Sequence, residues 1–161
     1  MNYFFKRHRP EIIASLGFLT VAMALGCGAK SGDPLWYESL IKASFNPPSW
    51  IFGPVWGILY VMIGIAFGKV WKIRHQSPGL FVIFITQLLF NLLWPWLFFY
   101  FHRPDFAFYD ICLLWFTLIF LMSRSYKTPA RSVVIWLMLY LLWTSFALIL
   151  NFTTAKLNHY F

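Results

Sequence analysis

Residues 47–60 read PPSWIFGPVWGILY, a run of proline, glycine and aromatic residues where a loop enters a long apolar segment. The paired prolines hold the approach to this segment extended, and Ser49 is placed to cap a helix. Pro54 fits a helix only in its first turns. Trp56 and Tyr60 are then four residues apart on one helical face. The stretch predicts the start of a helix that directs two aromatic side chains the same way.

Composition places this helix in a membrane. The chain has 161 residues, is 60% hydrophobic and 11% charged, and has a mean hydropathy of +0.66, which is too apolar for a soluble domain of this length. Apolar stretches of the length needed to cross a bilayer, about 20 residues each, run over residues 12–29, 50–71, 80–101, 106–123 and 133–152. We therefore predict an all-α membrane protein, a single domain over residues 1–161 folded as a bundle of five transmembrane helices.

The positions of the basic residues predict the orientation. The chain has 13 Lys and Arg residues and a net charge of +8. Three clusters precede the first span, follow the second and follow the fourth: Lys6, Arg7 and Arg9; Lys69, Lys72 and Arg74; Arg124, Lys127 and Arg131. A cytoplasmic N-terminus places all three clusters inside. A surface that binds nucleic acid needs contiguous basic residues, and here they are divided between short loops, so we expect no nucleic-acid partner. The partner expected from the apolar spans is the lipid bilayer.

The connection over residues 30–49 is much longer than the others, and this orientation places it on the outer face. Loops of this length in compact proteins are often functional lids. The other connections are short, which indicates antiparallel neighbours in a compact bundle.

Amides and tryptophans lie deep in the predicted spans. Gln87 and Asn91 share a face of the third span, and an unpaired amide in hydrocarbon is costly, so both side chains must point into the bundle. Structural hydrogen bonding between helices and a ligand pocket both account for them.

Trp56 and Trp143 are too deep to be interface anchors. Six residues lie about 8–15 Å below the outer ends of their spans at 1.5 Å per residue, namely Trp56, Tyr60, Asn91, Trp94, Trp143 and Ala147. Flat indoles beside an amide favour a slot for a planar apolar ring.

Other residues exclude several functions or leave alternatives open. The histidines, His8, His75, His102 and His159, fall at span ends or in loops, so we expect no histidine-ligated haem, no other cofactor and no metal site. Asp110 is expected to be exposed at the interface or paired with Arg103. In the second span, Gly53-x-x-x-Gly57 and Gly64-x-x-x-Gly68 indicate close helix packing inside the bundle or a homodimer face.

The segment 47–60 resembles the signature of the translocator protein (TspO/MBR) family, also known as the peripheral-type benzodiazepine receptor family. Further matches follow in the same order along the chain: Trp36, Tyr37, Gln87, Asn91, Trp94, the stretch WTSFA at 143–147, and Asn151. The chain departs from the family at Ala43 and Leu139, where the family usually has proline, and at Phe45, where it commonly has tryptophan.

The resemblance implies a site for porphyrins and benzodiazepine-type drugs, lined by Trp36, Tyr37, Trp56, Tyr60, Gln87, Asn91, Trp94, Trp143 and Ala147. Porphyrin would be a ligand, and homodimers are common in the family. The leading hypothesis is a membrane receptor or carrier of tetrapyrroles rather than an enzyme. One alternative is a light-dependent porphyrin-degrading enzyme with Trp56 and Trp143 as its catalytic pair. Another is a regulatory or scaffold membrane protein that senses a ligand. The short chain suits a bacterial cell membrane.

Overall fold

The computed structural model describes residues 12, 13, 15–17, 20 and 34–161, and the regular structure in this part of the chain is helical. Its elements are α2 (Pro34–Ser39), α3 (Ser49–Lys72), α4 (Pro78–Pro95), the π-helical turn η1 (Trp96–Tyr100), α5 (Pro104–Tyr126) and α6 (Val133–Leu157). Four segments are long and apolar enough to cross a membrane: Ser49–Lys72, Pro78–Tyr100, Pro104–Tyr126 and Val133–Leu157. These confirm four of the five predicted spans to within a few residues. The fifth prediction, residues 12–29, lies largely outside the described residues.

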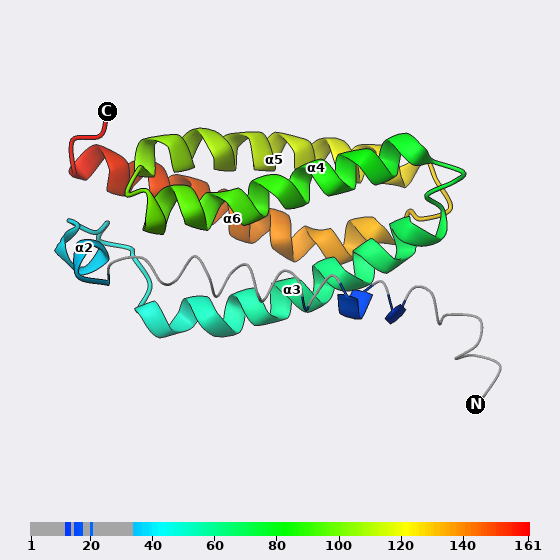
Figure 1. Ribbon diagram of the computed structural model, residues 1–161, viewed down its shortest axis with the longest axis horizontal. Helices are drawn as coiled ribbons and strands as arrows, with labels where there is room; N and C mark the ends of the chain where they lie inside the picture. The colour runs from blue at the N-terminus through cyan, green and yellow to red at the C-terminus, as the bar shows by residue number, and fades with distance from the viewer. Residues whose placement is uncertain (1–11, 14, 18–19, 21–33) are drawn as a thin grey trace.

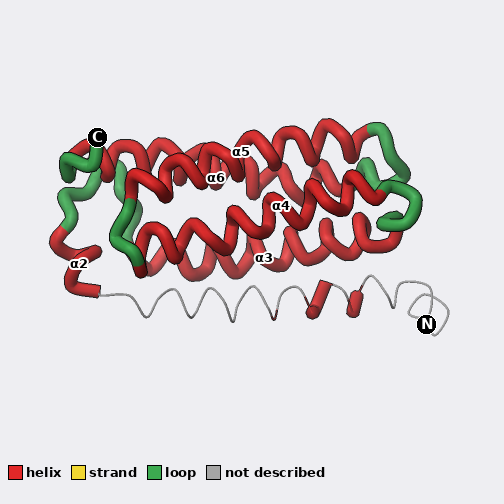
Figure 2. The backbone as a smooth tube through the Cα atoms, turned by 45° about the horizontal axis from the view of Figure 1, so that its top comes forward, coloured by secondary structure: helices red, strands yellow, loops and turns green. Residues whose placement is uncertain are grey.

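The four long helices lie lengthwise beside one another, and their connections gather at two ends (Figures 1 and 2). One end, called here the α2 end, carries α2, the turn between η1 and α5, and the C-terminus. The other, the basic end, carries the α3–α4 and α5–α6 connections with Lys69, Lys72, Arg74, Arg124, Lys127 and Arg131. Two of the three predicted basic clusters therefore share one end of the bundle.

The start of α3 differs in one detail from the prediction. The helix begins at Ser49 itself, and Pro48 occupies the capping position with an extended backbone (φ −53°, ψ 139°). The prediction of Ser49 as the cap is therefore wrong, because the preceding proline already ends the extended approach. Pro54 lies inside the helix near its beginning, as expected. The exposed residue Trp50 belongs to the same first turns.

Proline also shapes the end of α4. Pro95 has no backbone N–H, and its ring opposes the carbonyl of Asn91 one turn earlier. The chain responds by widening into η1, where the Phe101 N–H donates to the Trp96 carbonyl at 2.9 Å, five residues back. A π-turn of this kind holds one residue more than an α-helical turn. By contrast α6, with Leu139 instead of proline, runs without a break over its whole length.

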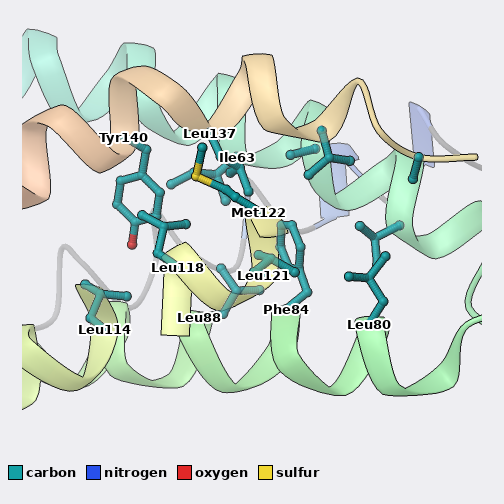
Figure 3. Packing of buried hydrophobic residues seen from close by; sticks show 14 of the residues in the cluster. Ile63, Leu80, Phe84, Leu88, Leu114, Leu118, Leu121, Met122, Leu137 and Tyr140 are labelled. Atoms are coloured by element: carbon teal, nitrogen blue, oxygen red, sulfur yellow. The ribbon is translucent and has the colours of Figure 1, made fainter. Parts of the chain in front are cut away.

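Aliphatic side chains fill the bundle toward the basic end. The members of this cluster that are fully excluded from solvent include Ile63, Ala66, Val70, Phe84, Leu118, Leu121, Val133 and Leu137. Figure 3 shows Ile63, Phe84, Leu118, Leu121 and Leu137 interleaved between the helices. Tyr140 lies toward one side of the cluster, and its ring points from α6 across the bundle (Figure 3). The cluster packs α3, α4, α5 and α6 into one unit, which positions the polar residues farther along the same helices.

The two glycine pairs of α3 differ in their surroundings. Gly64 and Gly68 are buried in the bundle, as the close-packing interpretation requires. Gly53 and Gly57 are exposed, and a Cβ placed on either would meet no described atom within 4 Å. Among the described residues, the packing interpretation therefore holds only for the pair nearer the basic end.

Candidate functional site

Aromatic rings and an amide from three helices meet toward the α2 end. Trp56 and Tyr60 of α3 have ring centroids 5.4 Å apart, which confirms that they share a face. Trp56 also contacts Tyr140 of α6 edge-on at 6.4 Å. The Tyr140 hydroxyl accepts a hydrogen bond of 2.7 Å from Asn91 Nδ2 of α4. The prediction that these side chains turn inward is correct for α3 and α4, and the structure adds Tyr140 as the residue that joins them.

A second polar contact lies beside the first. Trp94 Nε1 donates to Asn151 Oδ1 at 2.9 Å, and Asn151 Nδ2 donates to the Pro104 carbonyl at 2.8 Å. One amide thus joins α4, α5 and α6. Both polar groups of the Asn151 side chain are used, so interhelical hydrogen bonding accounts fully for this residue.

Trp143 lies in an aromatic row that links α3, α6 and the segment before α3. Its ring contacts Phe52 at 5.9 Å and Phe146 at 5.5 Å. Phe146 in turn contacts Phe45 at 6.3 Å. Ala147, four residues beyond Trp143, is partly buried against the core. The two tryptophans singled out from the sequence therefore have different ring partners, because Trp143 contacts α3 one turn nearer its start than Trp56.

The short helix α2 connects to this region through one aromatic chain. Trp36 stacks on His102 with centroids 4.3 Å apart and contacts Phe98 edge-on at 5.6 Å. Tyr37 contacts the same Phe98 at 6.3 Å. Phe98 then stacks on Trp94 at 5.0 Å. The predicted lid residues Trp36 and Tyr37 are thus one ring away from Trp94.

Further contacts hold the long connection against the bundle. The Ile41 N–H donates to Asn158 Oδ1, and Asn158 Nδ2 donates to the Ile41 carbonyl, both at 2.9 Å. Lys42 lies over the Tyr37 ring, 4.8 Å from its centroid. Burial raises the pKa of Tyr37, and a hydrogen bond with Asn46 partly opposes this. The segment that follows α2 is therefore fixed at both its backbone and its side chains.

Some buried polar atoms at this level have no hydrogen-bond partner in the part of the chain that the structure describes. Gln87 is fully buried, yet neither its Oε1 nor its Nε2 makes a hydrogen bond. Asn91 is 3% exposed, and its Oδ1 is likewise without a partner. Buried polar side chains nearly always have a hydrogen-bond partner. Interhelical bonding accounts for Asn91 Nδ2 and Asn151, but it does not account for Gln87.

Asp110 contradicts the expectation made for it. Its side chain is 4% exposed, on the face of α5 that also carries the buried residues Ala107 and Leu114. Arg103 instead pairs with Asp105, with Nη2 and Oδ2 2.6 Å apart. The prediction of interfacial exposure or pairing with Arg103 is wrong, because the rotation of α5 turns Asp110 into the bundle.

Sequence reasoning missed Tyr140, Phe98 and Asp110 as members of this region. Tyr140 could have been found, since it lies one turn before Trp143 on the inward face of its span. Phe98 could not, because its direction depends on the π-turn. Among the described residues, no group of three or more His, Cys, Asp or Glu side chains could hold a metal ion.

The fold and the site define a multi-pass helical membrane protein with tryptophans and incompletely bonded amides in one part of the bundle. The family model described as the TspO/MBR family matches residues 4–157. The tryptophan-rich protein TspO of Chlorobaculum tepidum is 40% identical over 76% of this chain and 79% of that protein. The human translocator protein is 31% identical over 93% of both chains, and the tryptophan-rich sensory protein of Cereibacter sphaeroides is 31% identical over 88% of this chain and 90% of that protein. The chain belongs to the TspO/MBR family and is an integral, multi-pass membrane protein.

Proposed function

We propose that this protein is a membrane receptor or carrier that binds porphyrins and similar planar, apolar tetrapyrroles. The observation that carries the proposal is the fully buried Gln87, whose amide has no partner among the described residues, beside Asn91, whose Oδ1 has none there either. Such groups are expensive in hydrocarbon unless a ligand or water completes their bonds. Trp56 contacts Tyr140, which bonds Asn91, and Trp143 packs against α3 one turn nearer its start. Indole rings of this kind suit a flat ring system.

In this proposal, α2 and residues 40–48 act as the lid of the site. Trp36 and Tyr37 contact Phe98, which stacks on Trp94, so a movement of the lid would change the surroundings of Trp94 directly. The two hydrogen bonds between Asn158 and Ile41 hold the lid in its closed position. The proposed ligand site therefore consists of Trp36, Tyr37, Trp56, Tyr60, Gln87, Asn91, Trp94, Trp143 and Ala147.

The binding experiment records the absorbance spectrum of the purified full chain with protoporphyrin IX in the dark. We expect a shifted Soret band on binding, and an affinity about tenfold lower in Trp143→Ala, because one large aromatic contact is lost. Trp136→Ala is the matched control: Trp136 is a partly buried tryptophan of the same helix, two turns nearer the basic end. Equal losses in both variants, or no loss in Trp143→Ala, would contradict the site.

Illumination of the same sample separates receptor or carrier from enzyme. A shifted band that persists in light supports binding or carriage. Bleaching to a new product over many equivalents, only when both Trp56 and Trp143 are present, would instead make the protein a light-dependent porphyrin-degrading enzyme with these two residues as its catalytic pair. Absence of any shift in the dark would remove the tetrapyrrole ligand.

We further propose that the protein forms homodimers through the exposed Gly53 and Gly57 of α3, where helix backbones of two copies could approach closely. Crosslinking in native membranes tests this: Gly57→Leu is expected to abolish the dimer, and Gly79→Leu, a matched exposed glycine at the start of α4, is expected to leave it intact.

A further inference from the structure

Three buried oxygen atoms toward the α2 end of the bundle lack hydrogen-bond partners. They are Gln87 Oε1, Asn91 Oδ1 and Asp110 Oδ2, and their side chains are 0%, 3% and 4% exposed. In the same group, Gln87 Nε2 is the unpartnered donor. The unpartnered polar atoms of these three side chains are therefore three acceptor oxygens and one amide nitrogen.

The three oxygens belong to one region of the bundle. Gln87 and Asn91 are four residues apart on the same face of α4. Asn151 bonds both Trp94 of α4 and Pro104 of α5. From this shared level, at about 1.5 Å per residue, Asp110 lies about 9 Å farther toward the basic end on α5, and Asn91 and Gln87 lie about 5 and 11 Å farther on α4. Asp110 is therefore at the level of the bundle between Asn91 and Gln87.

An acceptor that is buried without a donor costs free energy, and the cost is greater for a carboxyl group than for an amide. In a bilayer the lipid tails offer no donors. Since the described side chains leave these oxygens unbonded, a ligand that carries N–H or O–H groups could complete their hydrogen bonds.

We propose that Asp110 forms, together with Asn91 and Gln87, a subsite that accepts hydrogen bonds from N–H or O–H groups of a ring-shaped ligand. This inference rests on the proposed function and narrows its substrate class: the site selects planar apolar rings that carry a donor over the same rings with the donor blocked. Asp110 is then a specificity-determining residue, and Trp56 and Trp143 supply contacts that every flat ring can make.

Carbazole and 9-methylcarbazole test the subsite, because they are flat tricyclic rings that differ by one N–H donor. Binding of each to the purified full chain in nanodiscs is measured by ligand fluorescence, with empty nanodiscs correcting for partition into lipid. We expect the full chain to bind carbazole about tenfold more tightly than 9-methylcarbazole, the ratio that one hydrogen bond to a buried acceptor supplies.

Asp110→Leu keeps the size of the side chain and removes its acceptors, so the preference for carbazole is expected to fall to about twofold or less. Asp110→Asn, which exchanges one carboxyl oxygen for a donor, is expected to reduce the preference as well and serves if the leucine variant does not fold. The matched control is Ser125→Ala, since Ser125 is a buried polar residue of the same helix whose hydroxyl already donates to the Leu121 carbonyl at 2.7 Å.

Equal binding of the two carbazoles, or an unchanged preference in both Asp110 variants, would overturn the subsite. Failure of both carbazoles to bind while protoporphyrin IX still binds would also overturn it and leave the proposed function standing. Failure of all three probes would remove the proposed function and the subsite together.

Discussion

The two halves of the bundle are built from different kinds of side chain. From the middle toward the α2 end, the buried polar residues are Gln87, Asn91, Asp110, Thr144, Asn151 and Thr154. Toward the basic end, the buried polar side chain among the described residues is Ser125, which bonds a carbonyl of its own helix. Aliphatic and phenyl groups occupy the rest of that half.

This difference separates the part of the molecule that maintains the fold from the part that can bind a ligand. The half at the basic end contains well-packed groups that need no outside partner. The half at the α2 end contains amide and carboxyl atoms whose hydrogen bonds are incomplete within the protein. Natural proteins accept such unfavourable local arrangements mainly at functional sites. Substitutions in the half at the basic end should therefore lower stability and leave ligand binding unchanged. Substitutions of the incompletely bonded residues in the other half should weaken ligand binding and leave stability nearly unchanged.

The largest loss of stability is expected from Phe84→Ala at the basic end. Phe84 is fully buried and packs against Phe67 with ring centroids 5.6 Å apart. Its truncation should lower the free energy of unfolding by about 3–5 kcal/mol, measured by unfolding in mixed micelles, while the folded fraction keeps its affinity for protoporphyrin IX. A loss of affinity as large as that of Trp143→Ala would contradict the division between the halves.

Asn151→Leu should have a smaller effect on stability. The variant leaves Trp94 Nε1 and the Pro104 carbonyl without partners, so the free energy of unfolding should fall by about 1–3 kcal/mol. Thr153→Val is the control, because the Thr153 hydroxyl bonds only the Ile149 carbonyl within its own helix. If the two variants lose the same stability, Asn151 does not join the helices as described.

The two glycine pairs of α3 offer a comparison within one helix. Gly68→Leu introduces a large side chain into a buried position and should cost about 1–3 kcal/mol of unfolding free energy. Gly57→Leu should leave the stability of the monomer nearly unchanged, because this position is open among the described residues. Unfolding of both variants under identical conditions tests this, and equal destabilisation would mean that Gly57 is packed as closely as Gly68.

No loss of stability is expected from Gln87→Leu. Since the Gln87 amide has no partner within the described part of the chain, replacing it with an apolar group of similar size should leave the free energy of unfolding unchanged or raise it by up to about 1 kcal/mol. The same change should weaken binding of protoporphyrin IX. Thermal unfolding without ligand and the absorbance titration together measure both effects, and a clear loss of stability would show that the amide has a partner in the resting protein.

The spans could be predicted from the sequence because the thickness of the bilayer sets their length, and a stretch of about 20 apolar residues matches that thickness as a helix. The pairing of Trp56 with Tyr60 could be predicted as well, since residues four apart on a helix are neighbours. The burial of Asp110 and the bond between Asn91 and Tyr140 could not. Both depend on how each helix is rotated about its axis, and a helix that is apolar on all sides carries little information about that rotation.

The π-turn after Pro95 has a consequence for insertions and deletions. Each residue of an α-helix turns the chain by about 100°, so removing one residue from Trp96–Tyr100 would let the segment return to α-helical geometry. Because the π-turn holds one residue more than an α-helical turn, the parts on either side of it would nearly keep their directions, and His102 would still reach the ring of Trp36. Relatives one residue shorter in this segment should therefore keep both the residues around Asn91 and the contact that holds the lid against the end of the helix.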